Sequence, residues 1–408
     1  MLMTANRRFA FSASRRLARA DWSASRNHET YGTGFERQWG SGENYTAHLV
    51  LAGEPDPVTG MLVNLTAVKA AFEPVVESSF DHAFLNLDTP PFDHLPPTPE
   101  LVARELLSRG QAACAELGVS VVACHLAESA ATAATAYADG RVERDWWLEF
   151  SAARVTRSPY LSEAENEALF GRAASPLGHG HGYRLRVTLA GPLDRESGLV
   201  ASYGLVGRLL GELHEMLDHR NLNLEVPMLA RQPITSECLA RFIFVYLWPH
   251  LPIARVRLHE MPHFFAEYDG ERGYLGLERT FSAAHCLRVA SFSEERNRQV
   301  FGKCANPNGH GHRYTVQATV ANPINDRTGI VFPLDRFTEG LEEVLARLDG
   351  RHLDLEVEAF RSRPSTGENI ALTLWPQLYE RLEERLVRLR IFETPNNRFT
   401  LRGEAGAR

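Results

Sequence analysis

The feature that most constrains the fold of this 408-residue chain is an internal repeat. Three segments open in the same way: FAFSASRRL at 9–17, LEFSAARV at 148–155 and RTFSAAHCL at 279–287. A second similar segment follows each of them: GENYTAHLVLAG at 42–53, GHGYRLRVTLAG at 180–191 and GHRYTVQATVAN at 311–322. The aligned tyrosines are 138 and 131 residues apart, at Tyr45, Tyr183 and Tyr314. This regularity predicts three tandem copies of one domain.

Each copy has the same predicted order of elements. The two opening segments read as strands, and a turn ending in glycine follows, at Gly60, Gly198 and Gly329. A helical stretch then ends in FDHAFLN, LDHRNLN or LDGRHLD. A second helix begins at PTPE (97–100), ITSE (234–237) or STGE (365–368), patterns related to the capping box. The copy closes with strands that carry Glu128, Glu260 or Glu393, and we place the three copies at 1–139, 140–272 and 273–408.

The predicted fold class is α+β, with units of the order strand–strand–helix–helix–strand–strand. A single four-stranded sheet of this kind would leave two open edges, which invite pairing with other strands. Three units in one chain can close a ring of twelve strands and remove those edges. The triplication therefore predicts a pseudo-threefold antiparallel β-barrel with helices on one face of the sheet.

Composition excludes several classes of protein. The net charge of −7 and the absence of long Lys or Arg runs give no support to nucleic-acid binding. No apolar stretch is long enough to cross a bilayer, and MLMTANRRFAFSAS has no apolar signal core. Five scattered cysteines do not form a disulfide framework. We therefore expect a soluble globular protein of the cytoplasm, with no membrane partner.

Copy three contains a predicted metal site. His310 and His312 are two residues apart on a strand, so both side chains leave the same face. His285 lies on the preceding strand, which should pair antiparallel with this one. Isolated strand histidines are usually not ligands, but three imidazoles on adjacent strands suit a tetrahedral Zn²⁺ ion with one open position. An open position is typical of catalytic zinc.

Cys304 lies in the segment that joins these two strands, six residues before His310. A thiol near zinc and near Lys303 can have a lowered pKa and serve as base or nucleophile. The alternative is a small buried apolar residue. Cys286, next to His285 on the strand, should face away from the metal.

The first two copies lack this set. Copy two keeps His179 and His181 but has Arg154 in place of His285 and Ala173 in place of Cys304. Copy one has arginine, serine and glutamate at the three ligand positions, namely Arg15, Ser41 and Glu43. A guanidinium has no lone pair for zinc. The sequence therefore predicts one metal site per chain.

An Asp-His pair shows the opposite distribution. Copies one and two contain Asp81-His82 and Asp218-His219, whereas copy three has Asp349-Gly350. Such a pair alone is usually a helix-end feature. Because the copy with the metal ligands lacks the histidine, we predict an active site shared across a seam between copies.

These residues resemble the 6-pyruvoyltetrahydropterin synthase / 6-carboxytetrahydropterin synthase family over nearly the whole chain. The resemblance is most specific in copy three, in VFGKCANPNGHGHRY, NPINDRTGIVFPLDRF and VRLRIFETPNNRF. It implies the tunnelling fold, barrels of three units, and head-to-head stacking of two barrels, which makes a homodimer of this chain one arrangement to test.

The resemblance also implies residue roles. Zinc would sit on the three histidines, Cys304 would be the base, and Glu393 would anchor the pterin ring. Thr366 and Glu368 match substrate-binding positions, although Gly367 replaces a threonine of the family pattern. An Asp-His pair would assist the cysteine from an adjoining unit, and Asp218-His219 resembles the family motif more closely than Asp81-His82 does.

The leading hypothesis is a zinc-dependent lyase that converts 7,8-dihydroneopterin triphosphate to 6-pyruvoyltetrahydropterin and releases triphosphate. One alternative is formation of 6-carboxytetrahydropterin, on the route to deazapurines such as queuosine. The five-residue gap between Cys304 and His310 is similar to the 6-pyruvoyl type. A non-catalytic pterin-binding scaffold is a second alternative, and the intact cysteine and histidines argue against it.

Overall fold

The computed structural model describes residues 1–403, and its main feature is one closed antiparallel β-barrel. Copy one supplies β1 (Leu2–Arg15), β2 (Ser41–Gly53), β4 (Ser120–Ala127) and β5 (Thr132–Tyr137). Copy two supplies β6 (Val142–Arg154), β7 (His179–Gly191), β9 (Ile253–Met261) and β10 (Phe264–Tyr268). Copy three supplies β11 (Gly273–His285), β12 (His310–Asn322), β14 (Leu386–Thr394) and β15 (Asn397–Arg402). Each of these twelve strands pairs with the strand that follows it in the list above, and pairing of β15 with β1 closes the ring. The predicted fold class and twelve-stranded barrel are confirmed.

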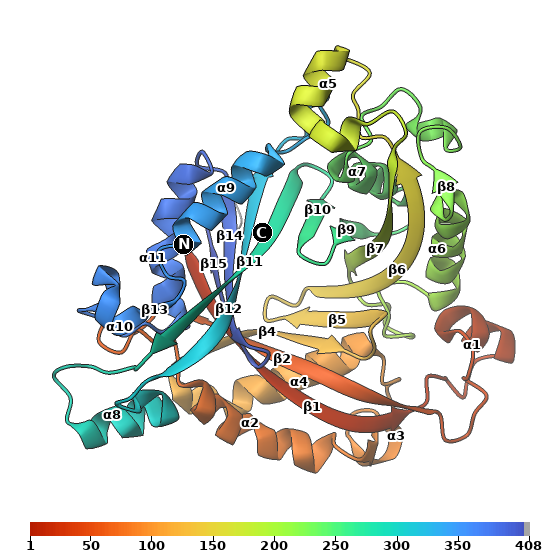
Figure 1. Ribbon diagram of the computed structural model, residues 1–408. Helices are drawn as coiled ribbons and strands as arrows, with labels where there is room; N and C mark the ends of the chain where they lie inside the picture. Colours follow the sequence, from red (N-terminus) through yellow and green to blue (C-terminus); the bar gives the residue numbers. More distant parts are fainter. Residues whose placement is uncertain (404–408) are drawn as a thin grey trace.

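Two long helices of each copy cover the outer face of the barrel (Figure 1). The first set is α2 (Leu65–Ser79), α6 (Tyr203–Leu217) and α9 (Leu334–Leu345). The second set is α4 (Pro99–Ala113), α7 (Ser236–Leu247) and α11 (Gly367–Arg381). Between the helices and the sheet, a stacked Phe-Tyr pair repeats at ring distances of 5.0, 5.0 and 4.9 Å: Phe11–Tyr45, Phe150–Tyr183 and Phe281–Tyr314. The repeated tyrosine of the sequence is therefore a core residue in every copy.

The segment between the first two strands of each copy contains a helix that the sequence pattern did not predict. These helices are α1 (Ala24–Tyr31), α5 (Glu163–Phe170) and α8 (Glu294–Phe301), and they lie at three corners of the molecule (Figure 1). A serine caps each one, and in α5 Ser162 and Glu165 form a complete capping box. That Ser-x-x-Glu pattern was a usable signal for the helix.

Short parallel strands extend the sheet where each Asp-His or Asp-Gly pair lies. They are β3 (Ala83–Phe84), β8 (Arg220–Asn221) and β13 (Arg351–His352), and they pair with β1, β6 and β11. One-turn helices follow two of them, α3 (Leu85–Asp88) and α10 (Leu353–Glu356). The residue after each aspartate has a positive φ: 57° at His82, 55° at His219 and 70° at Gly350. A left-handed backbone favours glycine, so Gly350 fits this position at no conformational cost.

The Thr and Glu of the three helix-start motifs join neighbouring copies. The threonine hydroxyls donate to carbonyl oxygens of the next copy's turn, from Thr98 to Gly198, Thr235 to Gly329 and Thr366 to Gly60. The glutamates accept backbone N–H groups of the same turns, at Glu100 from Val200, Glu237 from Val331 and Glu368 from Leu62. The threonines also cap their own helices, as the pattern predicted, but the glutamates reach across the seam.

Candidate metal centre and active site

Three histidines of copy three converge at one end of β11 and β12. In the strand register, His285 pairs with His310 and Ala283 pairs with His312. The Nε2 atoms of His285 and His310 are 3.0 Å apart, and the three ring centroids are separated by 4.5, 5.2 and 4.8 Å. The antiparallel pairing predicted from the sequence therefore brings all three imidazoles together.

The chemistry of these nitrogens fits a metal ion. His285 is fully buried, and burial together with the two neighbouring imidazoles lowers its pKa to about 4, so it is neutral at neutral pH. Within residues 1–403, Nδ1 of His310 and Nε2 of His312 are buried without a hydrogen-bond partner. Nδ1 of His285 lies 3.3 Å from the Tyr314 hydroxyl, an outer contact that can fix the ring orientation. The three residues could hold a metal ion.

Cys304 lies beside this cluster, in a 3-10 turn (Gly302–Ala305) that follows α8. Its carbonyl oxygen accepts the Leu287 N–H at 2.8 Å, which ties the turn to the end of β11. The thiol sulfur and one ring nitrogen each of His285 and His310 lie within 4.8 Å of one another. Burial, followed by the charge of Glu393, raises the pKa of the thiol to about 11. In the protein alone, the thiol is therefore protonated at neutral pH, and a cation nearby would favour the thiolate.

Glu393 reaches the same cluster from the end of β14. One of its carboxylate oxygens and ring nitrogens of His285 and His312 lie within 4.8 Å of one another. Asn397 donates its side-chain amide to the carboxylate at 3.2 Å. Cys304, Glu393 and the three histidines, proposed from separate parts of the sequence, therefore form one constellation.

The matching positions of copies one and two contain ion pairs. Arg154 donates to Glu260 at 2.6 Å, and Arg15 donates to Glu128 at 2.7 Å. These arginines have the strand register of His285, each opposite the first residue of the next strand. In copy two, His179, His181 and Glu260 still form a cluster that could hold an ion, and His181 contacts Glu260 at 2.8 Å. The Arg154 guanidinium nevertheless forms an ion pair with the Glu260 carboxylate and supplies the positive charge that a metal ion would bring.

Copy one borders the constellation of copy three. Met61 packs against the same small apolar cluster as Cys304, and Asn64 donates to the Val300 carbonyl oxygen at 3.1 Å. Thr366 and Glu368, expected to bind substrate, are engaged with this same segment through Gly60 and Leu62. Their counterparts do the same in copies that lack the histidine triad. The contacts thus give both residues a role in joining copies, and substrate binding by them stays a prediction.

Strand pairing also locates the two Asp-His pairs. One edge of β1 pairs with β15 of copy three over its first residues, and farther along the same edge Ser12 donates to Asp81. Asp81-His82 is thus at the seam between copies three and one. Ser151 of β6 donates to Asp218 in the same way, so Asp218-His219 is at the seam between copies one and two. The choice of Asp218-His219, made on motif similarity, is therefore not supported by the topology, which favours Asp81-His82.

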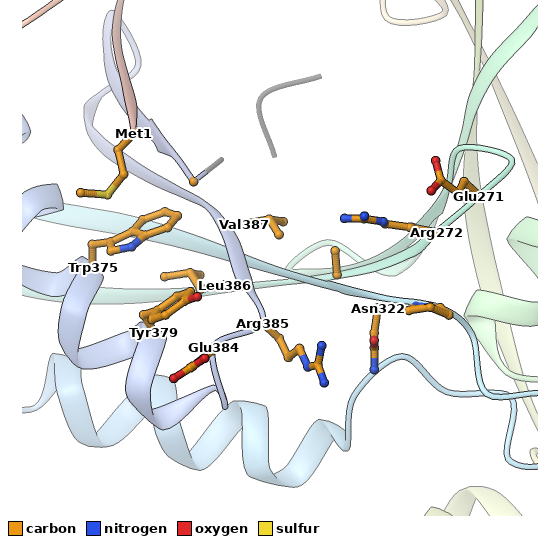
Figure 2. Close-up of a pocket in the computed structure, with 13 residues that line it drawn as sticks. Met1, Glu271, Arg272, Asn322, Trp375, Tyr379, Glu384, Arg385, Leu386 and Val387 are labelled. Atoms are coloured by element: carbon orange, nitrogen blue, oxygen red, sulfur yellow. The ribbon is translucent and has the colours of Figure 1, made fainter. Parts of the chain in front are cut away.

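Neither histidine of these pairs touches Cys304 in the structure. His82 Nδ1 lies 2.8 Å from Asp81, and its side chain is 85% exposed. The ring lines a surface cavity of about 550 Å³ together with Ser12 and Asn44. A larger cavity of about 620 Å³ lies at the opposite end of β12, between Trp375, Arg385 and Arg272 (Figure 2). None of the predicted site residues lines that larger cavity within residues 1–403.

Together, the barrel and the histidine cluster define a triplicated α+β protein whose third copy has three histidines that could hold a metal ion. The 6-pyruvoyl tetrahydropterin synthase family model matches it three times, over residues 4–139, 147–271 and 274–404. The chain therefore belongs to the 6-pyruvoyl tetrahydropterin synthase family. Among the described residues, no helix is long and apolar enough to span a membrane.

Single-copy relatives each match about a third of the chain. The 6-pyruvoyl tetrahydrobiopterin synthase of Drosophila melanogaster is 44% identical over 133 residues, which is 32% of this chain and 79% of the relative. The Homo sapiens protein of the same name is 40% identical over 31% of this chain and 88% of its own length. The solved 6-pyruvoyl tetrahydropterin synthase of Caenorhabditis elegans covers 33% of this chain and 96% of its own, at 34% identity and a TM-score of 0.32.

Proposed function

We propose that this protein is a zinc-dependent lyase that converts 7,8-dihydroneopterin triphosphate to 6-pyruvoyltetrahydropterin with release of triphosphate. One observation carries the proposal: copy three keeps the three histidines, Cys304 and Glu393 together, in a chain of the 6-pyruvoyl tetrahydropterin synthase family. A pterin-binding scaffold without catalysis would not require the Cys304 thiol beside three histidines that could hold a metal ion.

His285, His310 and His312 would hold the zinc ion. When bound, zinc supplies a Lewis acid that polarises oxygens of the substrate side chain and acidifies the neighbouring C–H bonds. Three protein ligands leave a position open, as catalytic zinc sites do.

The other residues of the constellation have distinct proposed roles. The Cys304 thiolate removes a proton from one carbon of the side chain and returns it at another. Glu393 accepts hydrogen bonds from the amino-pyrimidine edge of the pterin and fixes the ring relative to the thiol. Redistribution of the protons along the side chain allows triphosphate to leave.

An Asp-His pair is proposed to exchange the proton of Cys304. Asp81-His82 is supported over Asp218-His219 because it shares the seam with the constellation of copy three. The Asp81 carboxylate accepts from the Ser12 N–H and contacts Nδ1 of His82, an arrangement that orients the imidazole. Its exposed ring would have to approach Cys304 when substrate binds.

The test is direct incubation of the purified full chain, loaded with zinc, with 7,8-dihydroneopterin triphosphate. Mass spectrometry should identify 6-pyruvoyltetrahydropterin, and triphosphate should accumulate in equal amount. Formation of 6-carboxytetrahydropterin with acetaldehyde would replace this proposal by the alternative enzyme. Tight pterin binding without turnover would replace it by the scaffold.

A further inference from the structure

The inner face of the barrel carries a group of four arginines in copy three. On β14 and β15, the core residues Leu389, Ile391, Phe399 and Leu401 face the outer helices. Side chains alternate along a strand, so the residues next to these core positions face the barrel interior, and four of them are arginines: Arg388, Arg390, Arg398 and Arg402. Figure 1 shows these strands on the ring, with the helices on its outer side. Each arginine is partly buried and keeps some surface accessible to solvent.

The strand register places these charges close together. Arg388 of β14 is the direct cross-strand partner of Arg402 of β15, and Arg390 lies on the same face two residues farther along β14. Like charges directly opposite each other destabilise a pair of strands. A negative charge nearby would stabilise an antiparallel hairpin that carries such a pair.

Three carboxylates of the barrel interior are already paired with other arginines, and Glu278 is linked to Arg390 only through Gln317. Glu267 is held by Arg257 at 2.6 Å, Asp145 lies 3.7 Å from Arg186, and Glu143 forms its ion pair with Arg255. Within residues 1–403, the four arginines of β14 and β15 form no ion pair with a carboxylate.

Neutral groups are the polar partners that these arginines do have. Arg390 donates to the Gln317 side-chain oxygen at 3.0 Å, and Arg388 donates to the Thr319 hydroxyl at 3.4 Å. In the described part of the chain, the Nε atoms of Arg388, Arg390 and Arg398 are buried without an acceptor. These are donors of hydrogen bonds that no protein group accepts.

The pKa of Arg388 also reflects the repulsion between the neighbouring arginines. Burial, and then the charges of Arg257 and Arg402, lower the pKa of Arg388 to about 9 although Glu267 opposes the shift. Guanidinium groups stay protonated at neutral pH, so the repulsion is not relieved by loss of a proton. The nearby His48 and His125 have pKa values lowered by burial to about 3 and about 4, and they are neutral. An external anion would supply the negative charge that Glu267 alone does not.

We propose that the barrel interior beside β14 and β15 binds a small multivalent oxyanion of the phosphate class, held by Arg388, Arg390, Arg398 and Arg402. A tetrahedral oxyanion suits this set because each planar guanidinium can donate two parallel hydrogen bonds to it. The site is separate from the histidine triad, since His310 and His312 share the outward face of β12 with the core residue Tyr314.

The test is thermal unfolding of the zinc-loaded full chain in inorganic phosphate and in chloride at equal ionic strength. Phosphate should raise the Tm of the wild type by several degrees more than chloride does. The double variant Arg388→Gln/Arg390→Gln should lose this difference. The matched control is Arg347→Gln, which removes an exposed arginine from the outer surface and should keep it.

Two results would overturn the proposal. Equal shifts with phosphate and chloride in the wild type would mean ionic screening alone. A phosphate-specific shift that persists in the double variant would mean that the anion binds elsewhere, including at the zinc ion. If the double variant does not fold, wild-type crystals soaked in tungstate, an electron-dense phosphate analogue, decide the matter. Anomalous density between β14 and β15 inside the barrel supports the site, and its absence there refutes it.

Discussion

In two of the three copies an arginine, Arg15 or Arg154, stands at the position of the ligand histidine His285. Each replaces a ligand histidine by a side chain that carries its own positive charge, and each pairs with the glutamate that matches Glu393. A buried carboxylate without a cation would be costly, so the arginine stabilises the glutamate that a metal ion would otherwise neutralise.

Arg154→Ala would leave a buried carboxylate without a cation and would only destabilise the fold. Arg154→His should instead restore a set of three histidines with His179 and His181. We expect metal analysis to find one zinc ion per wild-type chain and two per variant chain. Without zinc, the variant should lose on the order of 3 kcal/mol of stability, because Glu260 loses its buried partner. The exposed control Arg172→His should bind one zinc ion. A wild-type chain with two or three tightly bound zinc ions would contradict the interpretation of the arginines.

Cys304→Ala should abolish turnover of dihydroneopterin triphosphate while zinc and pterin binding persist. The reason is that the thiol is proposed to move protons, and the three histidines are a sufficient ligand set without it. Zinc content by mass spectrometry and pterin binding by fluorescence titration separate the two roles. Near-normal turnover would remove Cys304 from the mechanism, and loss of zinc would make it a ligand.

At the level of elements, the sequence predicted more of the site than of its surroundings. The shared face of His310 and His312 followed from strand alternation, a local rule, and the predicted antiparallel pairing of their strand with that of His285 is confirmed. Helix α8, which leads into Cys304, was missed because its eight residues are short and mostly polar. The pairing of β1 with β15 joins residues about as far apart as this chain allows, and no local pattern encodes it. For that reason motif similarity could not show that Asp81-His82, and not Asp218-His219, shares the seam with the constellation of copy three.

His82→Ala is the element-scale test of the seam. It should lower kcat by about a hundredfold or more, the usual scale for a lost acid–base partner. His219→Ala is the matched control, because it removes the same side chain, with the same left-handed backbone, from the neighbouring seam. It should leave kcat nearly unchanged. The reverse pattern would return the role to Asp218-His219, and full activity in both variants would end the shared-seam model.

For the molecule as a whole, the three pairs of threonine and glutamate that join neighbouring copies, here called Thr-Glu locks, hold the ring together. The glutamates of these locks are buried. Burial raises the pKa of Glu368 to about 7 and that of its counterpart Glu237 to about 6. A carboxyl group whose pKa is higher in the folded than in the unfolded protein stabilises the fold fully below its unfolded pKa of about 4.5. This contribution is lost as the pH rises through about 7.

Glu368→Gln should therefore change how stability depends on pH. The amide oxygen can still accept the Leu62 N–H but has no proton to lose. Between pH 5 and pH 8, the wild type should lose on the order of 2 kcal/mol more unfolding free energy than the variant does. Urea denaturation at both pH values measures this difference, and Glu237→Gln should show a smaller one. Identical pH slopes for wild type and Glu368→Gln would show that the lock is not titrated in this range.

The pairing of β1 with β15 also sets the order in which the protein can be completed during synthesis. Arg7 and Asn397, which are hydrogen bonded across this seam, are 390 residues apart in the chain. The first strand must therefore leave the ribosome long before its partner exists, with one edge open to other strands for most of translation. The constellation of copy three borders the same seam, so the seam beside it closes only when the last strand has been made. Until β15 has been made, residues 2–7 of β1 have no strand partner on this edge within the chain.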